Sequence, residues 1–319
     1  MKHKFITSIL MAFFIIAATK NASACACGCG VFDVATSSLI PNNQENLAFL
    51  QYDYVGQSKN WHGTDLAPEE NNEHRKIRTQ TTTIGLQTMF NRNWGLNVRV
   101  PYVNRQVQMV HQHIEDHSHH SHISEEFMSA NVNSLGDIKV SGIYSGFFDN
   151  MSTGITLGLK LPTGKYEAKD LHDRAMQIGT GSTDALLGFY HLGKLTNDGI
   201  MNYFVQGSWQ KPFKIKDNYR SGDEMNLAIG YNYDFGMVGA FSKVSPLLQL
   251  VATDKIGDRG INSDPQNSGY SRLMLVPGIE VNYKKFKFYA DLGLPIYNNM
   301  KGNQLAATEI FKVIVAYKF

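Results

Sequence analysis

Apolar and polar residues alternate along most of the chain after residue 46, with the period of two that is typical of β-strands. Residues 224–235 show the pattern most clearly, because one face carries Met225, Leu227, Ile229, Tyr231, Tyr233 and Phe235. The other face carries small or polar residues, among them Asn226 and Asn232. The pattern therefore predicts strands that have one apolar face and one polar or mixed face.

The apolar faces are ordered along their length. Aliphatic residues lie centrally and, in several segments, aromatic residues lie at the ends; Trp94 and Tyr102, for example, flank Leu96, Val98 and Val100. This order is typical of a membrane-spanning strand, whose centre contacts lipid and whose aromatic ends lie at the two interfaces.

We predict twelve strands, over residues 46–56, 77–90, 94–107, 135–147, 153–161, 183–194, 200–209, 224–235, 243–253, 270–283, 286–297 and 307–319. Short turns alternate with long loops between them, as in outer-membrane barrels. In lipid the sheet must close so that every backbone group is paired. We therefore expect an all-β protein forming a single antiparallel up-and-down β-barrel. A soluble β-sandwich is the alternative, but it has no reason to sort its loops by length.

The first 24 residues have the pattern of a cleaved signal peptide. Lys2 and Lys4 precede an apolar run over residues 5–18, and Ala22-Ser23-Ala24 is a small-residue cleavage site. We expect a signal peptide (1–24), a Cys-containing N-terminal segment, periplasmic or in the lumen (25–45), and a transmembrane barrel (46–319). The expected location is the outer membrane of a Gram-negative bacterium.

The composition limits the partners. The net charge is only +2, and no block of Lys and Arg appears, so we expect no nucleic-acid partner. The expected partners are outer-membrane lipid, a small-molecule or metal-ion solute, and the barrel-assembly machinery. The last of these would recognise Phe319, because outer-membrane barrels commonly end on Phe.

Charged residues of both signs fall on the predicted inward face. The candidates that line the lumen are Arg99, Asp137, Lys139, Lys160, Asp184, Glu280, Lys287, Asp291 and Lys312. Twelve strands enclose a lumen wider than side chains alone need fill, so these residues fit a water-filled interior. They either line a path for a solute or only solvate and stiffen the barrel.

The only three cysteines of the chain, Cys25, Cys27 and Cys29, stand on alternate residues at the expected mature N-terminus. Thiolates suit soft or borderline ions such as Cu(I) and Zn(II). Because the exported compartment is oxidising, a disulfide with one remaining cysteine is an alternative. Lipid attachment at Cys25 is a third interpretation.

A second candidate metal site lies in the long predicted loop over residues 108–134. It holds six histidines, His111, His113, His117, His119, His120 and His122. Neutral imidazole binds Zn, Cu and Ni, and the irregular spacing favours a flexible chelator. A hydrophilic surface loop without metal is the alternative. No cofactor is required for a barrel of this kind.

Catalytic residues are not indicated. His191 is the strand-borne candidate, but no partner serine can be assigned to it from the sequence. We therefore expect that the protein is not an enzyme. The charged loop over residues 163–179 is expected to be solvated rather than to constrict the barrel mouth.

Six short motifs stand in order along the predicted barrel. They are Val98-Arg-Val-Pro-Tyr-Val103, Leu135-Gly-Asp-Ile138, Leu159-Lys-Leu-Pro-Thr-Gly164, Gly181-Ser-Thr-Asp184, Leu294-Pro-Ile-Tyr297 and Gly302-Asn-Gln-Leu305. In this order and spacing they resemble the MetA-pathway of phenol degradation family of outer-membrane transporter-like proteins, across the whole expected barrel. The resemblance implies a single-chain barrel that carries small hydrophobic or aromatic compounds. The cysteine-rich start and the histidine-rich loop depart from that pattern.

Two functions follow from these observations. The first is a passive outer-membrane channel or transporter for small solutes, either hydrophobic or aromatic compounds or metal ions. The alternative is a surface barrel that binds Zn, Cu or Ni through its histidine-rich external loop and transports nothing.

Overall fold

The structure, a computed structural model, describes residues 39–41, 44–67, 76–117, 120–171 and 173–319, and it gives no side-chain detail over residues 109–128. The expected signal peptide, the three cysteines and His119 lie outside the described residues.

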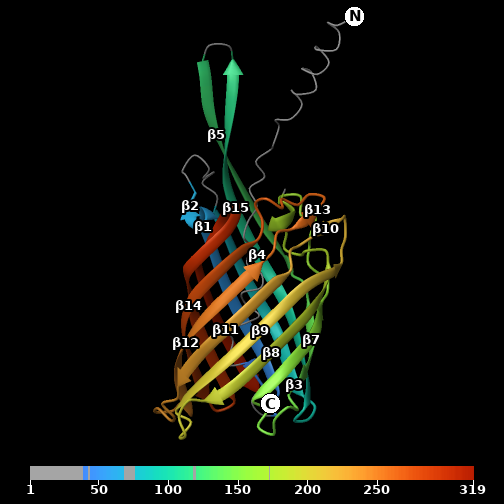
Figure 1. The fold of residues 1–319 in the computed structure, drawn as a ribbon. Coiled ribbons are helices and arrows are strands. Elements are labelled where there is room, and N and C mark those ends of the chain that lie inside the picture. Colours follow the sequence, from blue (N-terminus) through green and yellow to red (C-terminus); the bar gives the residue numbers. More distant parts are fainter. Residues whose placement is uncertain (1–38, 42–43, 68–75, 118–119, 172) are drawn as a thin grey trace, which may run out of the picture.

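The described chain forms the closed antiparallel β-barrel that the sequence predicts (Figure 1). Eleven strands make up the closed ring. In order they are β1 (Leu47–Gly63), β3 (Lys76–Met89), β4 (Trp94–His117), β6 (Lys139–Tyr144), β7 (Thr153–Lys160), β8 (Thr183–Lys194), β9 (Met201–Lys214), β11 (Glu224–Tyr233), β12 (Lys243–Lys255), β14 (Tyr270–Tyr283) and β15 (Phe286–Lys318). Pairing of β1 with β15 closes the ring, from Leu47 opposite Lys318 to Gly63 opposite Met300.

Strand β15 crosses the wall twice. Its first half pairs with β14, between Phe286 and Met300, and its second half pairs with β1. The two halves also contact each other, because Lys318 N donates to Lys285 O at 2.8 Å and the rings of Phe286 and Tyr317 lie 5.3 Å apart. The ring of eleven strands therefore makes twelve passes across the wall, and β1 and β15 meet antiparallel.

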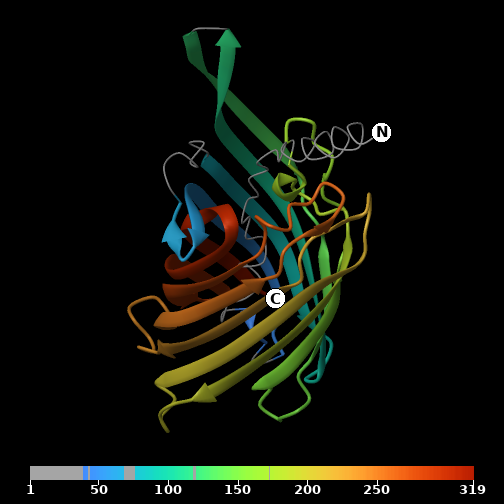
Figure 2. The same cartoon turned by 45° about the horizontal axis from the view of Figure 1, so that its top comes forward.

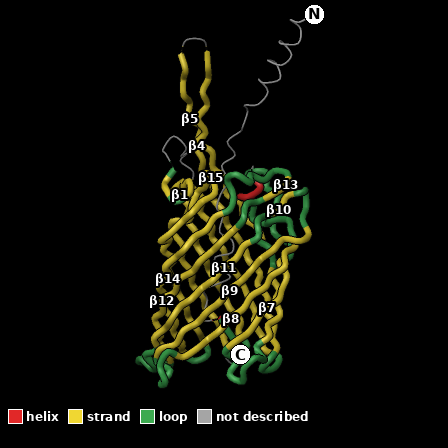
Figure 3. Tube along the Cα trace, viewed as in Figure 1, coloured by secondary structure: helices red, strands yellow, loops and turns green. Residues whose placement is uncertain are grey.

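A long hairpin rises above the barrel where the sequence predicts a loop over residues 108–134. It consists of the second part of β4 and the whole of β5 (His120–Leu135). The two strands pair from Tyr102 opposite Leu135 to His117 opposite His120 (Figures 1 and 3). The strand predicted over residues 135–147 shortens accordingly to β6. The prediction missed the hairpin because a ribbon outside the membrane needs no apolar face.

The two faces of the wall have opposite character. In β11 the residues Met225, Leu227 and Ile229 are exposed, whereas Asn226 and Ala228 are buried. This confirms the alternation predicted for that segment. Lipid covers the apolar residues on the outer face of such a barrel, which explains why they are exposed in the isolated chain.

Aromatic residues pair at the short-turn ends of several strands. Trp94 and Tyr144 lie with ring centroids 4.8 Å apart, and Tyr233 and Phe235 are equally close. The aliphatic band between the two ends includes Ile84, Leu157 and Ile229, each at least half exposed. An aliphatic belt bounded by aromatic residues matches the depth profile of a lipid bilayer.

Side chains of the wall and of the N-terminal segment pack together inside the barrel. The wall residues Val55, Ile143 and Phe204 belong to a buried apolar cluster that also contains Ile40. Leu39 packs in a second cluster with Phe49 and Tyr289. The described part of the N-terminal segment therefore lies inside the barrel.

Among the described residues, no helix is long and apolar enough to cross a membrane.

The outward face can be tested by one substitution. Ile229 lies near the centre of β11 and is 51% exposed, so Ile229→Arg should destabilise the barrel by roughly 2–4 kcal/mol. Met237→Arg, at a turn residue that is 80% exposed, is the matched control and should cost close to nothing. Urea unfolding of the protein in lipid vesicles measures both. Equal unfolding midpoints would contradict the assignment of this face to lipid.

Candidate functional site

Three of the sequence motifs meet at one buried ion-pair cluster. Lys160 Nζ lies 2.7 Å from Asp137 Oδ2 and 3.2 Å from Asp184 Oδ2, and at most 8% of each of these three residues is exposed. They come from the chain between β5 and β6, from the end of β7, and from the start of β8. Buried charges are stable only when they are paired, so each carboxylate fixes the lysine and is fixed by it.

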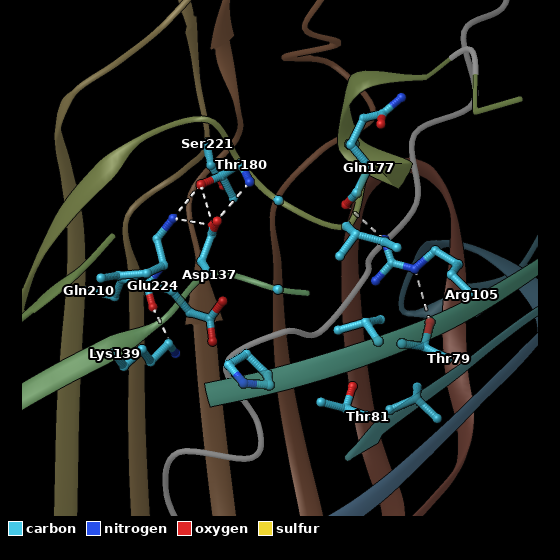
Figure 4. Close-up of a pocket in the computed structure, with 18 of the residues that line it drawn as sticks. Thr79, Thr81, Arg105, Asp137, Lys139, Gln177, Thr180, Gln210, Ser221 and Glu224 are labelled. Atoms are coloured by element: carbon cyan, nitrogen blue, oxygen red, sulfur yellow. Dashed lines mark hydrogen bonds and ion pairs between the residues drawn. The ribbon is translucent and has the colours of Figure 1, made fainter. Parts of the chain in front are cut away.

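Asp137 also binds the long loop over residues 161–182. Its Oδ1 accepts a hydrogen bond from Gly164 N at 2.9 Å, and its Oδ2 accepts one from Thr180 N at 3.1 Å. Figure 4 shows Asp137 and Thr180 pointing toward one another above the wall. One carboxylate thus holds both ends of the loop against the barrel.

The two ends of this loop also touch directly. A Cβ atom on Gly179 would lie 2.3 Å from Gly164 O, so the contact leaves no room for a side chain. Gly181 has φ of +67°, a left-handed conformation that glycine adopts without strain. Glycines at these positions therefore let the loop leave and re-enter the wall at one point.

Arg105 holds the tip of the same loop inside the barrel mouth. It extends inward from β4, is 2% exposed, and donates from one terminal nitrogen to Met176 O at 2.6 Å and to Gln177 O at 3.0 Å. Its Nε donates to Thr79 Oγ1 of β3 at 3.1 Å. Met176 belongs to the single helical turn η3 (Arg174–Met176), shown in red in Figure 3.

Apolar contacts complete this insertion and correct the prediction of a solvated loop. Loop residues Leu171, Met176 and Ile178 are buried in one cluster with the wall residues Ile77 and Val107. The charges that favoured solvation, such as those of Lys165 and Lys169, do face solvent. The prediction was wrong because the apolar residues between them follow no helix or strand period that marks a buried face.

A second structure covers the mouth beside the inserted loop. It consists of the chain around β10 (Tyr219–Arg220) and β13 (Arg259–Gly260), which pair as a two-stranded sheet. Both strands are labelled in Figure 1, and Figure 2 brings this end of the barrel forward. Asp258 accepts hydrogen bonds from Tyr219 OH at 2.7 Å and from Gly222 N at 2.8 Å, and lies 3.3 Å from Lys255 Nζ. Burial opposes ionisation of Asp258, but Lys255 and these donors hold the pKa of its carboxyl below its ordinary value.

A cavity of about 150 Å³ lies between the inserted loop and the wall. That is roughly ten times the space that one water molecule needs. Most of its lining residues are of polar types, among them Thr79, Asp137, Gln177, Ser221 and Glu224, several of which Figure 4 shows converging on the same space.

A second cavity, of about 120 Å³, lies deeper in the barrel and is lined by both polar and apolar residues. Leu39, Ile40 and Pro41 contribute to it from the N-terminal side. Arg99, Lys139 and Gln210 line both cavities, so they mark the junction between the two. Lys139 Nζ donates to Gln210 Oε1 at 3.4 Å, a contact drawn in Figure 4.

The remaining predicted lumen residues lie nearer the centre and the short-turn end. Glu280 is 3.7 Å from Lys243 Nζ, and Lys287 Nζ is 3.7 Å from Glu45. Asp291 accepts a hydrogen bond from Tyr289 OH at 2.7 Å. Lys312 is 3% exposed and stands directly opposite Asp53 in the sheet. These residues are buried inside the wall, and their contact with a solute stays a prediction.

Sequence reasoning missed Arg105, Gln210 and Glu224, which line the upper cavity. Arg105 could have been found, because it continues the inward alternation of Arg99 beyond the membrane-spanning part of β4. The contacts of Arg105 with Met176 and Gln177 depend on how the loop folds, and no local pattern indicates them.

The metal sites predicted from sequence stay predictions. Cys25, Cys27, Cys29 and His119 lie outside the described residues, and the side chains of the other five tract histidines are not described. In the part of the chain that the structure describes, no three His, Cys, Asp or Glu side chains form a group that could hold a metal ion.

His191, the only strand-borne candidate for catalysis, is half-buried between two hydroxyl groups. Its Nδ1 lies 2.7 Å from Thr153 Oγ1, and its Nε2 lies 3.1 Å from Tyr203 OH. Both partners anchor the imidazole to neighbouring strands, which accounts for its presence on the wall. That the protein is not an enzyme stays a prediction.

The fold and the lumen define the class of the molecule: it is an outer-membrane-type β-barrel with a loop folded into its mouth. No protein-family model matches the chain, and no curated protein matches it in sequence. Membership of the MetA-pathway of phenol degradation family therefore stays a prediction.

Solved structures with a similar fold include an outer membrane channel from Pseudomonas putida F1. Its TM-score is 0.63 at 12% identity, and the match covers 90% of this chain and 100% of that one. A FadL homologue from Pseudomonas aeruginosa has a TM-score of 0.47 at 11% identity, covering 93% and 98% of the two chains. The toluene transporter TodX from Pseudomonas putida has a TM-score of 0.45 at 8% identity, covering 93% and 94%. At such low identity these similarities concern the fold alone.

The lowered pKa of Asp258 predicts an acid-sensitive mouth. A depressed pKa stabilises the folded loops fully above the unfolded value of about 3.9, and this stabilisation is lost as pH falls through the lower folded value. At pH 7, Asp258→Asn should therefore weaken the protection of the Gly222 amide by about 1.5–3 kcal/mol, because it removes the charged acceptor of that amide's hydrogen bond.

Hydrogen exchange of this amide measures the effect, and Asp254→Asn, at an exposed neighbouring carboxylate, is the control. The difference between wild type and Asp258→Asn should shrink as the pH is lowered below about 4. A difference that stays constant down to pH 2.5 would show that the carboxylate charge is not what holds the loops.

Proposed function

We propose that the protein is a passive channel of the outer membrane for small solutes. The observation that carries the proposal is a closed barrel whose lumen holds two cavities with a shared charged junction at Arg99 and Lys139. Ionised side chains inside a barrel that excluded water would cost desolvation free energy. Their presence favours an interior that water and solutes enter.

The fold supports the same function. The similar structure from Pseudomonas putida F1 is described as an outer membrane channel, and it matches this chain over nearly its whole length. The orientation follows from the usual topology of such barrels, with the short turns in the periplasm and the long loops outside. The inserted loop and the structure around Asp258 would then face the external medium.

The contribution of the inserted loop to conductance can be tested by deleting it. Because Gly164 and Gly179 are in contact, residues 165–178 can be excised and the two glycines joined without moving β7 or β8. The excision removes the apolar loop residues and the contacts of Arg105 from the mouth. Single-channel conductance in planar bilayers should rise several-fold relative to wild type.

The control removes a similar length of chain outside the lumen. Gln108 and Ser129 are cross-strand partners, so a two-residue Asn-Gly turn can replace residues 109–128. This variant should conduct like wild type. If neither wild type nor the loop-excised protein conducts, and neither lets small sugars swell liposomes, the channel function is wrong.

The metal-binding function is supported as a second proposal by the register of the external hairpin. The backbone pairs His117 with His120, Glu115 with His122, and His111 with Glu126. Alternate residues of a strand share a face, so five of the six histidine positions fall on one face of the ribbon. Imidazole and carboxylate at neighbouring positions are a donor set that suits Zn, Cu and Ni.

The test compares wild type with a variant in which the six tract histidines are serine, and with His62→Ser as control. Zn(II) titration at pH 7.5 should show binding to wild type and to the control, and none to the six-serine variant. Binding should weaken as pH falls through about 6.5, where imidazole takes up a proton. Undiminished binding by the six-serine variant would place the site at Cys25, Cys27 and Cys29 instead.

A further inference from the structure

Arg174 stands where the inserted loop meets the second structure at the barrel mouth. We call that second structure the mouth cover; it consists of residues 216–223 and 256–261. The Arg174 guanidinium carbon lies 4.5 Å from the ring centre of Tyr166 in its own loop and 5.0 Å from that of Tyr219 in the mouth cover. A guanidinium within about 6 Å of a ring centre is attracted to the face of the ring. Arg174 therefore links two structures that come from distant parts of the chain.

A second contact of the same kind runs in the opposite direction. Lys216 of the mouth cover places its Nζ 5.0 Å from the ring centre of Tyr166 in the inserted loop. The loop and the cover thus each supply one cation and one aromatic ring to the region where they meet. A contact between a cation and a ring is modest in strength, so it can open and re-form more readily than a buried ion pair.

The position of the Arg174 side chain is fixed from within its own loop. Its terminal nitrogens donate to Tyr166 O and, at 3.1 Å, to Thr180 O. These two acceptors lie on the outgoing and the returning half of the loop, so the guanidinium ties the halves together. A Cβ atom on Gly181 would lie 2.6 Å from Arg174 Nη2, which shows how closely the side chain packs against the loop backbone.

The ring that faces Arg174 is fixed from within the mouth cover. Tyr219 is 3% exposed, and its hydroxyl group donates to Asp258 Oδ2 at 2.7 Å. The backbone around it is held by further bonds inside the cover, such as Ile261 N to Asn218 O at 3.0 Å. The two partners of the contact therefore belong to separate structures that are each held together internally.

The same two structures bound the upper cavity. Arg174 and Ala175 line it from the inserted loop, and Tyr219 and Ser221 line it from the mouth cover. Thr81 of β3 lines it from the barrel wall. A contact between the loop and the cover consequently narrows the way from the mouth into this cavity.

We propose that the inserted loop and the mouth cover form a two-part lid over the upper cavity, with the contact between Arg174 and Tyr219 as its latch. The inference goes beyond the proposed channel function, because it concerns access to the cavity rather than what crosses the barrel. Opening parts the ring from the guanidinium, while Arg174 keeps its bonds within the loop and Tyr219 keeps its bond to Asp258.

The experiment measures how fast methyl methanethiosulfonate, a small thiol reagent, modifies a cysteine in the upper cavity of the full chain folded in detergent. The reporter is Thr81→Cys in a chain whose three cysteines are replaced by serine. Tyr219→Leu and Tyr219→Phe both remove the hydroxyl group, but only Tyr219→Leu removes the ring that faces Arg174. Tyr219→Leu should react about two- to thirty-fold faster than Tyr219→Phe, the range expected for one such contact.

The same pair of variants is then compared in chains that also carry Arg174→Gln. Without the guanidinium, Tyr219→Leu and Tyr219→Phe should react at equal rates, because no cation holds the ring. A rate difference that persists with Arg174→Gln would show that the ring acts by packing alone, and this would overturn the latch. Equal rates of the two variants in chains that keep Arg174 would overturn it as well.

The control removes a contact of the same kind outside the lid. Lys211 lies 5.3 Å from the ring centre of Trp209 on the wall, and Lys211→Gln should leave the reaction rate of the reporter unchanged. Heat-modifiable mobility on gels checks that each variant is folded. If Tyr219→Leu does not fold, Arg174→Gln is compared with Lys211→Gln. A faster reaction with Arg174→Gln alone supports the latch, and equal rates overturn it.

Modification of the reporter does not require conduction, so the two proposals fail separately. If the variants respond as expected in a protein that conducts nothing, the channel function is wrong and the lid stands. If the protein conducts but the variants do not respond, only the lid is overturned.

Discussion

Pairing of every backbone N–H and C=O group within the wall is the constraint on which this structure depends. Lipid offers no partner to an open sheet edge, so the first and last strands must meet. The double pass of β15 provides that meeting, because it brings the chain back beside β1 in antiparallel register. Once the ring is closed, side chains alternate between lipid and lumen, and the polar half of every strand has to be accommodated inside.

The interior meets that demand in two ways. Buried charges pair across the wall, as Lys160 does with Asp137 and Asp184. Segments from outside the wall also fold in, and they fill space that wall side chains alone do not reach. The inserted loop brings apolar residues to the mouth, and Leu39 and Ile40 bring them to the deeper part. Part of the space that is left over forms the two cavities that share Arg99 and Lys139.

The sequence predicts the wall well and the lumen less well, for a physical reason. A lipid face imposes a strict period of two, so segments such as residues 224–235 and residues 307–319 can be recognised one by one. The inward position of Arg99 follows from the same period. The fold of the loop over residues 161–182 and the height of the β4–β5 hairpin depend on contacts between distant segments. The cross-strand pairing of Arg99 with Lys139 likewise requires the register, which alternation alone does not fix.

Because Gly164 and Gly179 are in contact, the loop between them is a separate unit whose two ends meet. Its length and content can change without any adjustment in β7 or β8, since both strands are already held by Asp137, Lys160 and Asp184. Barrels with this base could therefore acquire different loops, and with them different preferences among solutes, while the membrane-spanning wall is inherited unchanged. In such barrels the buried ion-pair cluster would stay the same, and the loop would be the part on which selection can act.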